Sequence, residues 1–224
     1  MGNARGRKRR KNGFLELSEQ SEVARKLMYE YRLSGGSGQE LSWLTQQHRQ
    51  PEKAIPVLVD WLDHLEERWE NEDVEERELA RILLIEALGT PSSRETAAIP
   101  ALIAQFDHSK GLSVNTLWAA GNSLYRIPAD DTYFDQLVGI ALDPSWGSGR
   151  EMVVDWLGRS QRKDEAAEAA LSLLDDETVQ GHALEALAQL RTQGIRDVIE
   201  PFTKSKNRWH RRTATRILNH LVED

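Results

Sequence analysis

The chain has 224 residues, a formal net charge of −7 and no cysteine, which excludes disulfides and thiolate metal sites. Apolar residues make up 39% of the chain and charged residues 29%, a polar balance that suits an elongated repeat with much exposed surface. No stretch approaches the ~20 apolar residues of a membrane span, and the N-terminus lacks the apolar centre of a signal peptide. We therefore expect a cytoplasmic protein that makes no membrane contact.

Charge is distributed unevenly along the chain. Residues 5–11 carry six lysines and arginines without an acid, whereas residues 66–78 carry eight acids against two arginines. From 191 to 216 the balance reverses, with eight basic residues against two acids. Such asymmetry bears on the choice of partner and on solubility, and it says little about the fold.

The N-terminal third predicts an arm followed by capping helices. Residues 1–13 show no apolar periodicity, so we expect a disordered basic arm. A helix is expected over about 19–33, and the glycine-rich segment 34–38 should end it. A short amphipathic segment, 39–48, follows. Residues 14–50 should thus cap the first hydrophobic face of a stack, as terminal repeats do.

Five leucines recur through the remainder of the chain at separations of 36, 33, 30 and 31 residues. A smaller or similar apolar residue precedes each of them by four positions, one helical turn earlier. A recurrence of this length with helical spacing indicates stacked helical repeats. These marker leucines are Leu88, Leu124, Leu157, Leu187 and Leu218, and the residues before them are Leu84, Ala120, Val153, Ala183 and Ala214.

Each marker leucine should lie in the second helix of a pair. The first helices are expected within 51–65, 94–106, 132–142, 163–174 and 195–204. Two Ser-x-x-Glu segments, 92–95 and 148–151, predict capping boxes, and Asn207 predicts an N-cap. No segment shows the alternation of a β-strand, so the chain should be all-helical.

Two of the expected first helices share an Ala-Ile-Pro element, at 54–56 and 98–100, and the second is followed by "LWAAGNSLYRI" (117–127). With these elements the chain resembles HEAT repeats, and especially the short bacterial HEAT-like repeats, over residues 52 to 222. The resemblance implies a right-handed α-α superhelix of about five helix pairs, occupying 51–224 behind an N-terminal helical cap. Pro56, Pro100 and Pro201 should kink the first helices from mid-helix positions.

No catalytic set emerges from the sequence. The six histidines lack metal-ligand spacing, and the two Gly-Ser-Gly segments lack the lysine of a phosphate-binding loop. No Gly-x-Ser-x-Gly elbow occurs. The paired aspartates at 130–131 and 175–176 precede expected helices, which favours a role as caps. We therefore expect a protein that is not an enzyme and that holds no metal or cofactor.

Two groups of residues are candidates for partner binding. The last expected helix carries a basic stripe that could hold phosphates or an acidic protein surface, or could simply solvate the end of the stack. Two tryptophans lie on second helices, which in HEAT arrays line the concave surface, although aromatic residues at helical spacing are more often core. The candidates are Arg208, Arg211, Arg212, Arg216, Trp118 and Trp156.

The leading hypothesis is a non-catalytic scaffold that binds a protein partner through its concave face. The alternative is nucleic-acid binding through the basic C-terminal helix and the arm, as in the HEAT-like alkylpurine DNA glycosylases that the repeats resemble. A third, more remote hypothesis follows from the resemblance to HEAT-like bilin lyase subunits. Contiguous basic charge across three or more repeats would favour nucleic acid, whereas a mixed surface with exposed tryptophan would favour protein.

Overall fold

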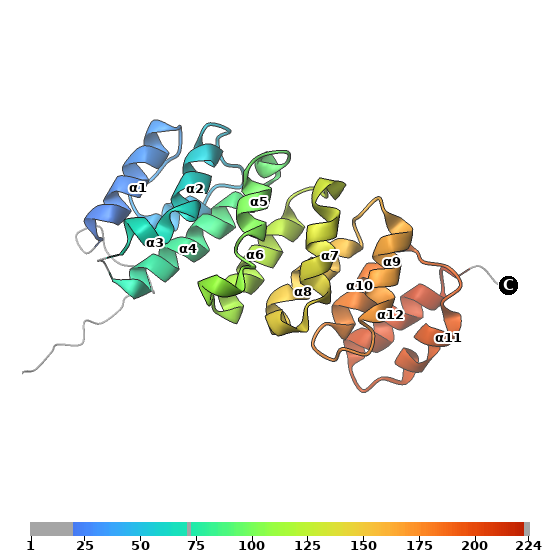
Figure 1. The fold of residues 1–224 in the computed structure, drawn as a ribbon. Coiled ribbons are helices and arrows are strands. Elements are labelled where there is room, and N and C mark those ends of the chain that lie inside the picture. The colour runs from blue at the N-terminus through green and yellow to red at the C-terminus, as the bar shows by residue number, and fades with distance from the viewer. Residues whose placement is uncertain (1–19, 71–72, 222–224) are drawn as a thin grey trace, which may run out of the picture.

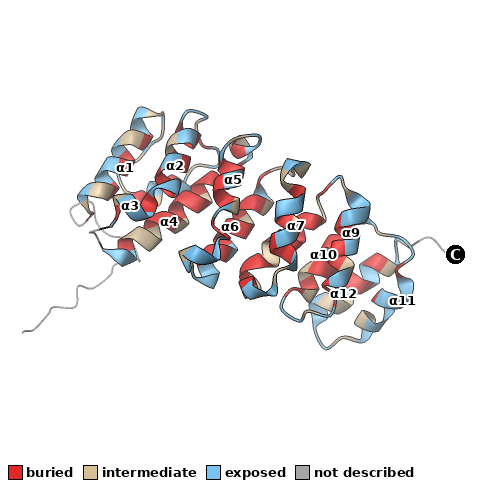
Figure 2. Cartoon of the chain, in the orientation of Figure 1, coloured by how far each residue is buried: buried red, intermediate tan, exposed pale blue. Residues whose placement is uncertain are grey.

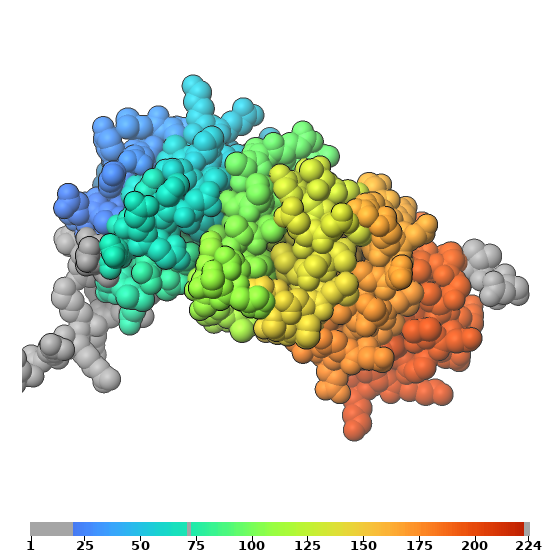
Figure 3. Space-filling view, viewed as in Figure 1, coloured from blue at the N-terminus to red at the C-terminus, as the bar shows by residue number. Residues whose placement is uncertain are grey.

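The computed structural model describes residues 20–70 and 73–221, and the predicted arm, 1–13, lies outside them. Twelve α-helices and several 3-10 turns make up these two ranges, within which no strand occurs. The prediction of an all-helical chain is confirmed for this part of the sequence. The helices follow one another along one long axis, from α1 at one end to α11 and α12 at the other (Figure 1). The space-filling view shows the same elongated outline (Figure 3).

The chain enters the stack through α1 (Glu22–Leu33) and a 3-10 turn, η2 (Leu41–Thr45). One face of α1 is buried because Leu27, Met28 and Tyr31 recur at helical spacing. The helix ends at Ser34, and Gly35 adopts a φ of 97°, a left-handed conformation that a glycine reaches without strain. The predicted glycine-rich stop is therefore confirmed.

Five helix pairs follow, as the leucine spacing predicts. The first helices are α2 (Ala54–Asp63), α5 (Ala98–Ile103), α7 (Phe134–Leu142), α9 (Lys163–Ser172) and α11 (Arg196–Ile199), and α3 (Leu65–Arg68) continues α2. The second helices are α4 (Val74–Leu88), α6 (Val114–Arg126), α8 (Glu151–Leu157), α10 (Gln180–Leu190) and α12 (Arg208–Leu218). The 3-10 turns between them are η3 (Pro91–Ser93), η4 (His108–Lys110), η5 (Asp131–Tyr133), η6 (Pro144–Arg150) and η7 (Glu200–Lys204).

The second helices form one continuous layer, because α4 packs on α6, α6 on α8, α8 on α10 and α10 on α12. We call these five helices the second-helix layer. Burial in this layer is uneven: residues 153–157 of α8 are all buried, whereas α6 and α12 also carry exposed residues (Figure 2). The marker leucines lie on the buried side: Leu124 is 3% exposed, and Leu88, Leu157 and Leu187 are not exposed at all. Leu218 is only partly buried, because α12 is the last helix and nothing in the described chain packs beyond it.

Two details of the predicted helix starts are wrong. The capping boxes at 92–95 and 148–151 do not form: the first amide of α5 donates to the hydroxyl of Thr96, and α8 has no side-chain cap. Glu95 instead sits in a left-handed turn with a φ of 59°, three residues before α5 begins. Glu151 approaches His182 of the next second helix. At 92–95 the chain therefore forms a turn at the place where the motif predicted the start of a helix.

The predicted proline kinks are wrong for Pro56 and Pro100. Pro56 and Pro100 are each the third residue of their helix, and Pro201 lies at the second position of η7. The first four amides of a helix have no intrahelical acceptor, so proline removes no hydrogen bond at these places. Pro56 and Pro100 therefore lie in the first turns of α2 and α5 without breaking them. Pro201 follows α11, where that helix ends and η7 begins.

Asn207 does cap α12, as predicted: its side-chain oxygen accepts a hydrogen bond from the backbone N–H of Trp209 at 2.9 Å. Replacing Asn207 with alanine should lower the free energy of unfolding by about 1 kcal/mol, because one amide at the helix start loses its acceptor. Urea denaturation followed by circular dichroism measures this change. Asn219→Ala, at the exposed end of the same helix, is the matched control and should change stability far less. Equal effects of both substitutions would contradict the role of Asn207 as a cap.

Two arginines are buried between repeats, which the sequence did not indicate. Arg81 of α4 is 1% exposed and donates to Glu66 at 2.5 Å and to Gln105 at 3.4 Å. Arg150, just before α8, is also 1% exposed and donates to the Ala141 carbonyl at 2.5 Å. Its guanidinium pairs with Asp176 in the following repeat as well. These arginines join elements that are far apart in sequence.

Candidate functional site

The exposed side of the second-helix layer can be read from the marker leucines. A helix turns about 100° per residue, so the residue two positions before a leucine lies about 160° around the helix from it. Because the leucines face the core, helix geometry turns these positions away from it, although only Arg216 is exposed and Asp155 is buried. We call them the outward row: Glu86, Asn122, Asp155, Glu185 and Arg216.

Trp118 lies beside this row on α6 and is 40% exposed. Val114, one turn earlier on the same side of the helix, is 47% exposed. The two side chains give α6, between α4 and α8 in the layer, an apolar surface. Tryptophan is enriched among the residues that contribute most to protein–protein binding, so the placement of Trp118 fits the expected partner surface.

Trp156 has a different environment, and the expectation that it faces a partner is not supported by its burial. Only 2% of it is exposed, and its indole packs at a tilt against Phe134 with 6.3 Å between ring centroids. Both tryptophans lie on second helices, but Trp156 directly precedes marker Leu157. It is consequently turned about 100° from that leucine, towards the inside of the stack.

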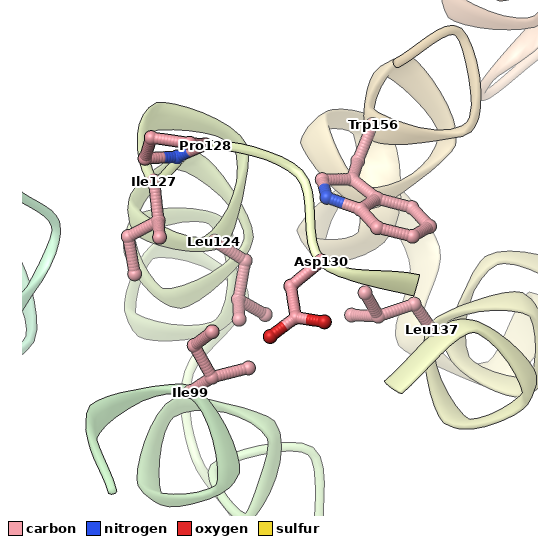
Figure 4. Close-up of a pocket in the computed structure, with 7 residues that line it drawn as sticks. All are labelled: Ile99, Leu124, Ile127, Pro128, Asp130, Leu137 and Trp156. Atoms are coloured by element: carbon pink, nitrogen blue, oxygen red, sulfur yellow. The ribbon is translucent and has the colours of Figure 1, made fainter. Parts of the chain in front are cut away.

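A small pocket opens beside Trp156, between the α5–α6 and α7–α8 pairs (Figure 4). The carboxylate of Asp130 points into it, and its pKa is lowered because Thr132 donates hydrogen bonds to it. The empty volume is about 200 Å³ including open solvent, below the roughly 300–1,000 Å³ of ligand sites. The pocket is therefore smaller than a typical ligand site. The walls are Ile99, Leu124, Ile127, Pro128, Asp130, Leu137 and Trp156.

Two of the four candidate arginines are engaged within the protein. Arg216 pairs with Glu185 of α10 at 2.5 Å, and the other oxygen of that carboxylate accepts from Thr213 at 3.2 Å. Arg211 donates to the carbonyls of Ser205 and Lys206 at 2.7 and 2.9 Å. Both arginines therefore hold α12 in place against the elements before it.

Arg208 and Arg212 are exposed, one turn apart, and neither has an ion-pair partner within the described chain. Burial lowers the pKa of neighbouring His210, which therefore adds no positive charge at neutral pH. The free basic surface of α12 is thus a short stripe, with Lys204 and Lys206 in the preceding turn. Arg126, at the end of α6, is also exposed and has no ion-pair partner within the described chain, but α6 and α12 are not neighbours in the layer.

Trp209 belongs to the same surface, although we did not single it out from the sequence. It is 40% exposed, covers Gly181 of α10 and meets His182 edge-to-face at 5.0 Å. A Cβ atom at Gly181 would lie 2.2 Å from the indole, so the close approach requires a glycine. The combination of a glycine and a tryptophan 28 positions apart, close to the repeat length, was a signal in the sequence.

Along the layer from α4 to α12, the charged residues of the outward row are acidic until the last helix, where the residue is basic. Glu86, Asp155 and Glu185 lie on α4, α8 and α10, and only α12 contributes an arginine. Contiguous basic charge across three repeats, the pattern expected of a nucleic-acid surface, is not found on the described second helices. The surface is instead mixed in charge, with exposed tryptophans on α6 and α12.

A serine, a histidine and an aspartate meet where the turns η4 and η6 contact each other, but they do not form a catalytic triad. Ser145 and Asp143 both approach Nε2 of His108, each at 3.3 Å. A triad needs the serine and the carboxylate on opposite ring nitrogens. His108 also stacks flat on Trp146 with 3.7 Å between centroids, so the cluster fastens two turns together.

Comparison of the chain with protein-family models, curated proteins and solved structures found no match. No group of three or more histidine and acidic side chains is arranged for a metal ion within 20–70 and 73–221. None of the helices in these ranges is both long and apolar enough to cross a membrane. The functional assignment therefore rests on the residues of the second-helix layer.

Proposed function

We propose that this protein is a non-catalytic HEAT-like scaffold that binds a protein partner. Its five helix pairs would form a right-handed superhelix, with the second-helix layer on the concave side. One observation carries the proposal: Trp118, on the second of the five helices of that layer, is 40% exposed beside exposed Val114. An exposed tryptophan with an apolar neighbour and a polar rim is typical of the centre of a protein interface.

Nucleic-acid binding is the weaker alternative. Its support is Arg208 and Arg212 on the last helix, Arg126 at the end of α6 and the basic residues at 5–11. Phosphate backbones need several aligned cations, and each contact steepens the salt dependence of binding. The carboxylates of the outward row on α4, α8 and α10 would repel a duplex laid across them.

The test uses a phage-displayed library of random 12-residue peptides, selected on the full chain at about 150 mM salt. Clones that bind should lose at least about tenfold in affinity on Trp118→Ala, the loss expected of a central anchor. Trp43→Ala is the matched control, because Trp43 is 41% exposed but lies in η2, outside the second-helix layer. Fluorescence anisotropy measures the affinities.

Two results would reject the proposal. The library could yield no binder, or the binders could respond equally to the two tryptophan substitutions. A 20-base-pair DNA duplex, tested at about 50 mM salt, decides on the alternative. Binding that weakens steeply with added salt and survives Trp118→Ala would favour nucleic acid.

A further inference from the structure

One carboxylate in the second-helix layer lacks the hydrogen bonds that its burial calls for. Asp155 of α8 is 8% exposed, and its Oδ1 is buried without a hydrogen-bond partner. Its Oδ2 lies 3.4 Å from Nδ1 of His182, but that nitrogen is also buried without a hydrogen bond. A buried polar atom left in this condition costs about 1–3 kcal/mol.

Two other partly buried carboxylates of the described chain are satisfied. Glu76 accepts from the N–H of Ser21 at 3.0 Å and from the indole of Trp69 at 3.3 Å. Glu185 accepts from Thr213 and Arg216. Each of these two carboxylates accepts two hydrogen bonds, whereas Asp155 accepts none within the described chain.

Glu151 shares this situation one turn earlier on α8. Its carboxylate lies 3.7 Å from Nε2 of the same His182, too far for a hydrogen bond. Its side chain is 26% exposed and that of Asp155 12%, so the pair keeps a narrow edge towards solvent. Two carboxylates therefore face a single imidazole, which can balance one charge at most.

The pair lies between two exposed aromatic surfaces. Trp118 is on α6, which packs against α8 on one side. On the other side, His182 of α10 touches Trp209 of α12. A cation among carboxylates, flanked by apolar side chains on indoles, would complement this arrangement in both charge and shape.

We infer that Glu151 and Asp155 are the seat of a single lysine or arginine side chain of the bound partner. This inference rests on the proposed function and adds the partner's chemistry: one cationic residue with apolar residues on both sides. The partner's cation would donate to the solvent-facing edge of the pair and would offset the negative charge that one imidazole leaves unbalanced. A buried anion that costs stability in the free protein would gain its compensation on binding.

The first test needs no partner. Asp155→Asn should leave the melting temperature unchanged or raise it, because the carboxylate makes no hydrogen bond that the change would remove. Glu185→Gln is the matched control on the same outward row, and it should lower the melting temperature by about 2–4 °C, since it weakens two hydrogen bonds. A comparable drop for Asp155→Asn would show that the aspartate serves the fold, and would overturn the inference.

The second test uses the 12-residue peptides selected on the full chain. The enriched sequences should share one lysine or arginine between apolar residues, and replacing that residue with glutamine should weaken binding at least tenfold. On Asp155→Asn protein, the original peptide should bind as weakly as the glutamine peptide does. Additive effects of the two changes, or enriched sequences without a common basic residue, would overturn the inference.

The two proposals fail in different ways. Peptides that depend on Trp118 but not on Asp155 would retain the scaffold and reject the cation seat. Peptides that bind independently of Trp118, or none at all, would reject the proposed function itself. A peptide that binds only when the buffer contains a divalent metal would indicate that a metal ion, and not a cationic side chain, occupies the site. That result also overturns the inference.

Discussion

Replacing Leu187 with alanine should lower the free energy of unfolding by about 2–5 kcal/mol. The side chain is completely buried in α10, between the α8 and α12 repeats, so its removal leaves a cavity where three repeats meet. In a stacked array each repeat is stabilised only by its neighbours, and the damage should spread to both. Urea denaturation followed by circular dichroism measures the loss.

Leu218→Ala provides the comparison. Leu218 is equivalent in the repeat but only partly buried in the last helix, so its replacement should cost clearly less. Hydrogen exchange should show α8 and α12 losing protection in Leu187→Ala, and mainly α12 in Leu218→Ala. An unchanged melting temperature in Leu187→Ala, or equal losses in the two variants, would contradict the stacked arrangement.

Arg150→Met should lower the free energy of unfolding by about 3 kcal/mol, near the low end for breaking a buried ion pair because Asp176 is partly exposed. Methionine nearly fills the space of the arginine stem but donates no hydrogen bond. The substitution therefore leaves the buried Ala141 carbonyl without its donor and removes the cation from Asp176. Urea denaturation at pH 7 measures the effect.

The acid dependence of stability checks the same pair. Burial raises the pKa of Asp176, but hydrogen bonds from Thr178 and Arg150 outweigh it and leave the pKa below its ordinary value. A carboxyl with a lowered folded pKa stabilises the protein above the unfolded pKa of about 3.9, and this contribution is lost as the pH falls further. Wild type should therefore exceed Asp176→Asn in stability at pH 7, and the difference should shrink below about pH 4. A constant difference would contradict the ion pair.

The candidate site was only partly predictable. Sequence placed Trp118 and Trp156 on second helices correctly, but treated them alike. Their angular positions relative to the marker leucines separate them. Trp118, six positions before Leu124, lies about 120° around the helix to one side, whereas Trp156, one position before Leu157, lies about 100° to the other side. That difference in position explains why one indole is exposed and the other buried. It needed only the helix period, so the distinction was within reach of the sequence.

The sequence by itself determined the helix pairs and the side of each second helix that faces the core. Leu124 and Ala120 show why. Both are buried and they lie four positions apart, and this helical spacing of apolar residues is visible in the sequence alone. Only the tertiary structure decided that Arg150 is buried and that Asp155 lacks donors. Those states depend on groups brought in from other repeats, which no local pattern encodes, because hydrogen bonding of a buried charge is settled by its neighbours in space.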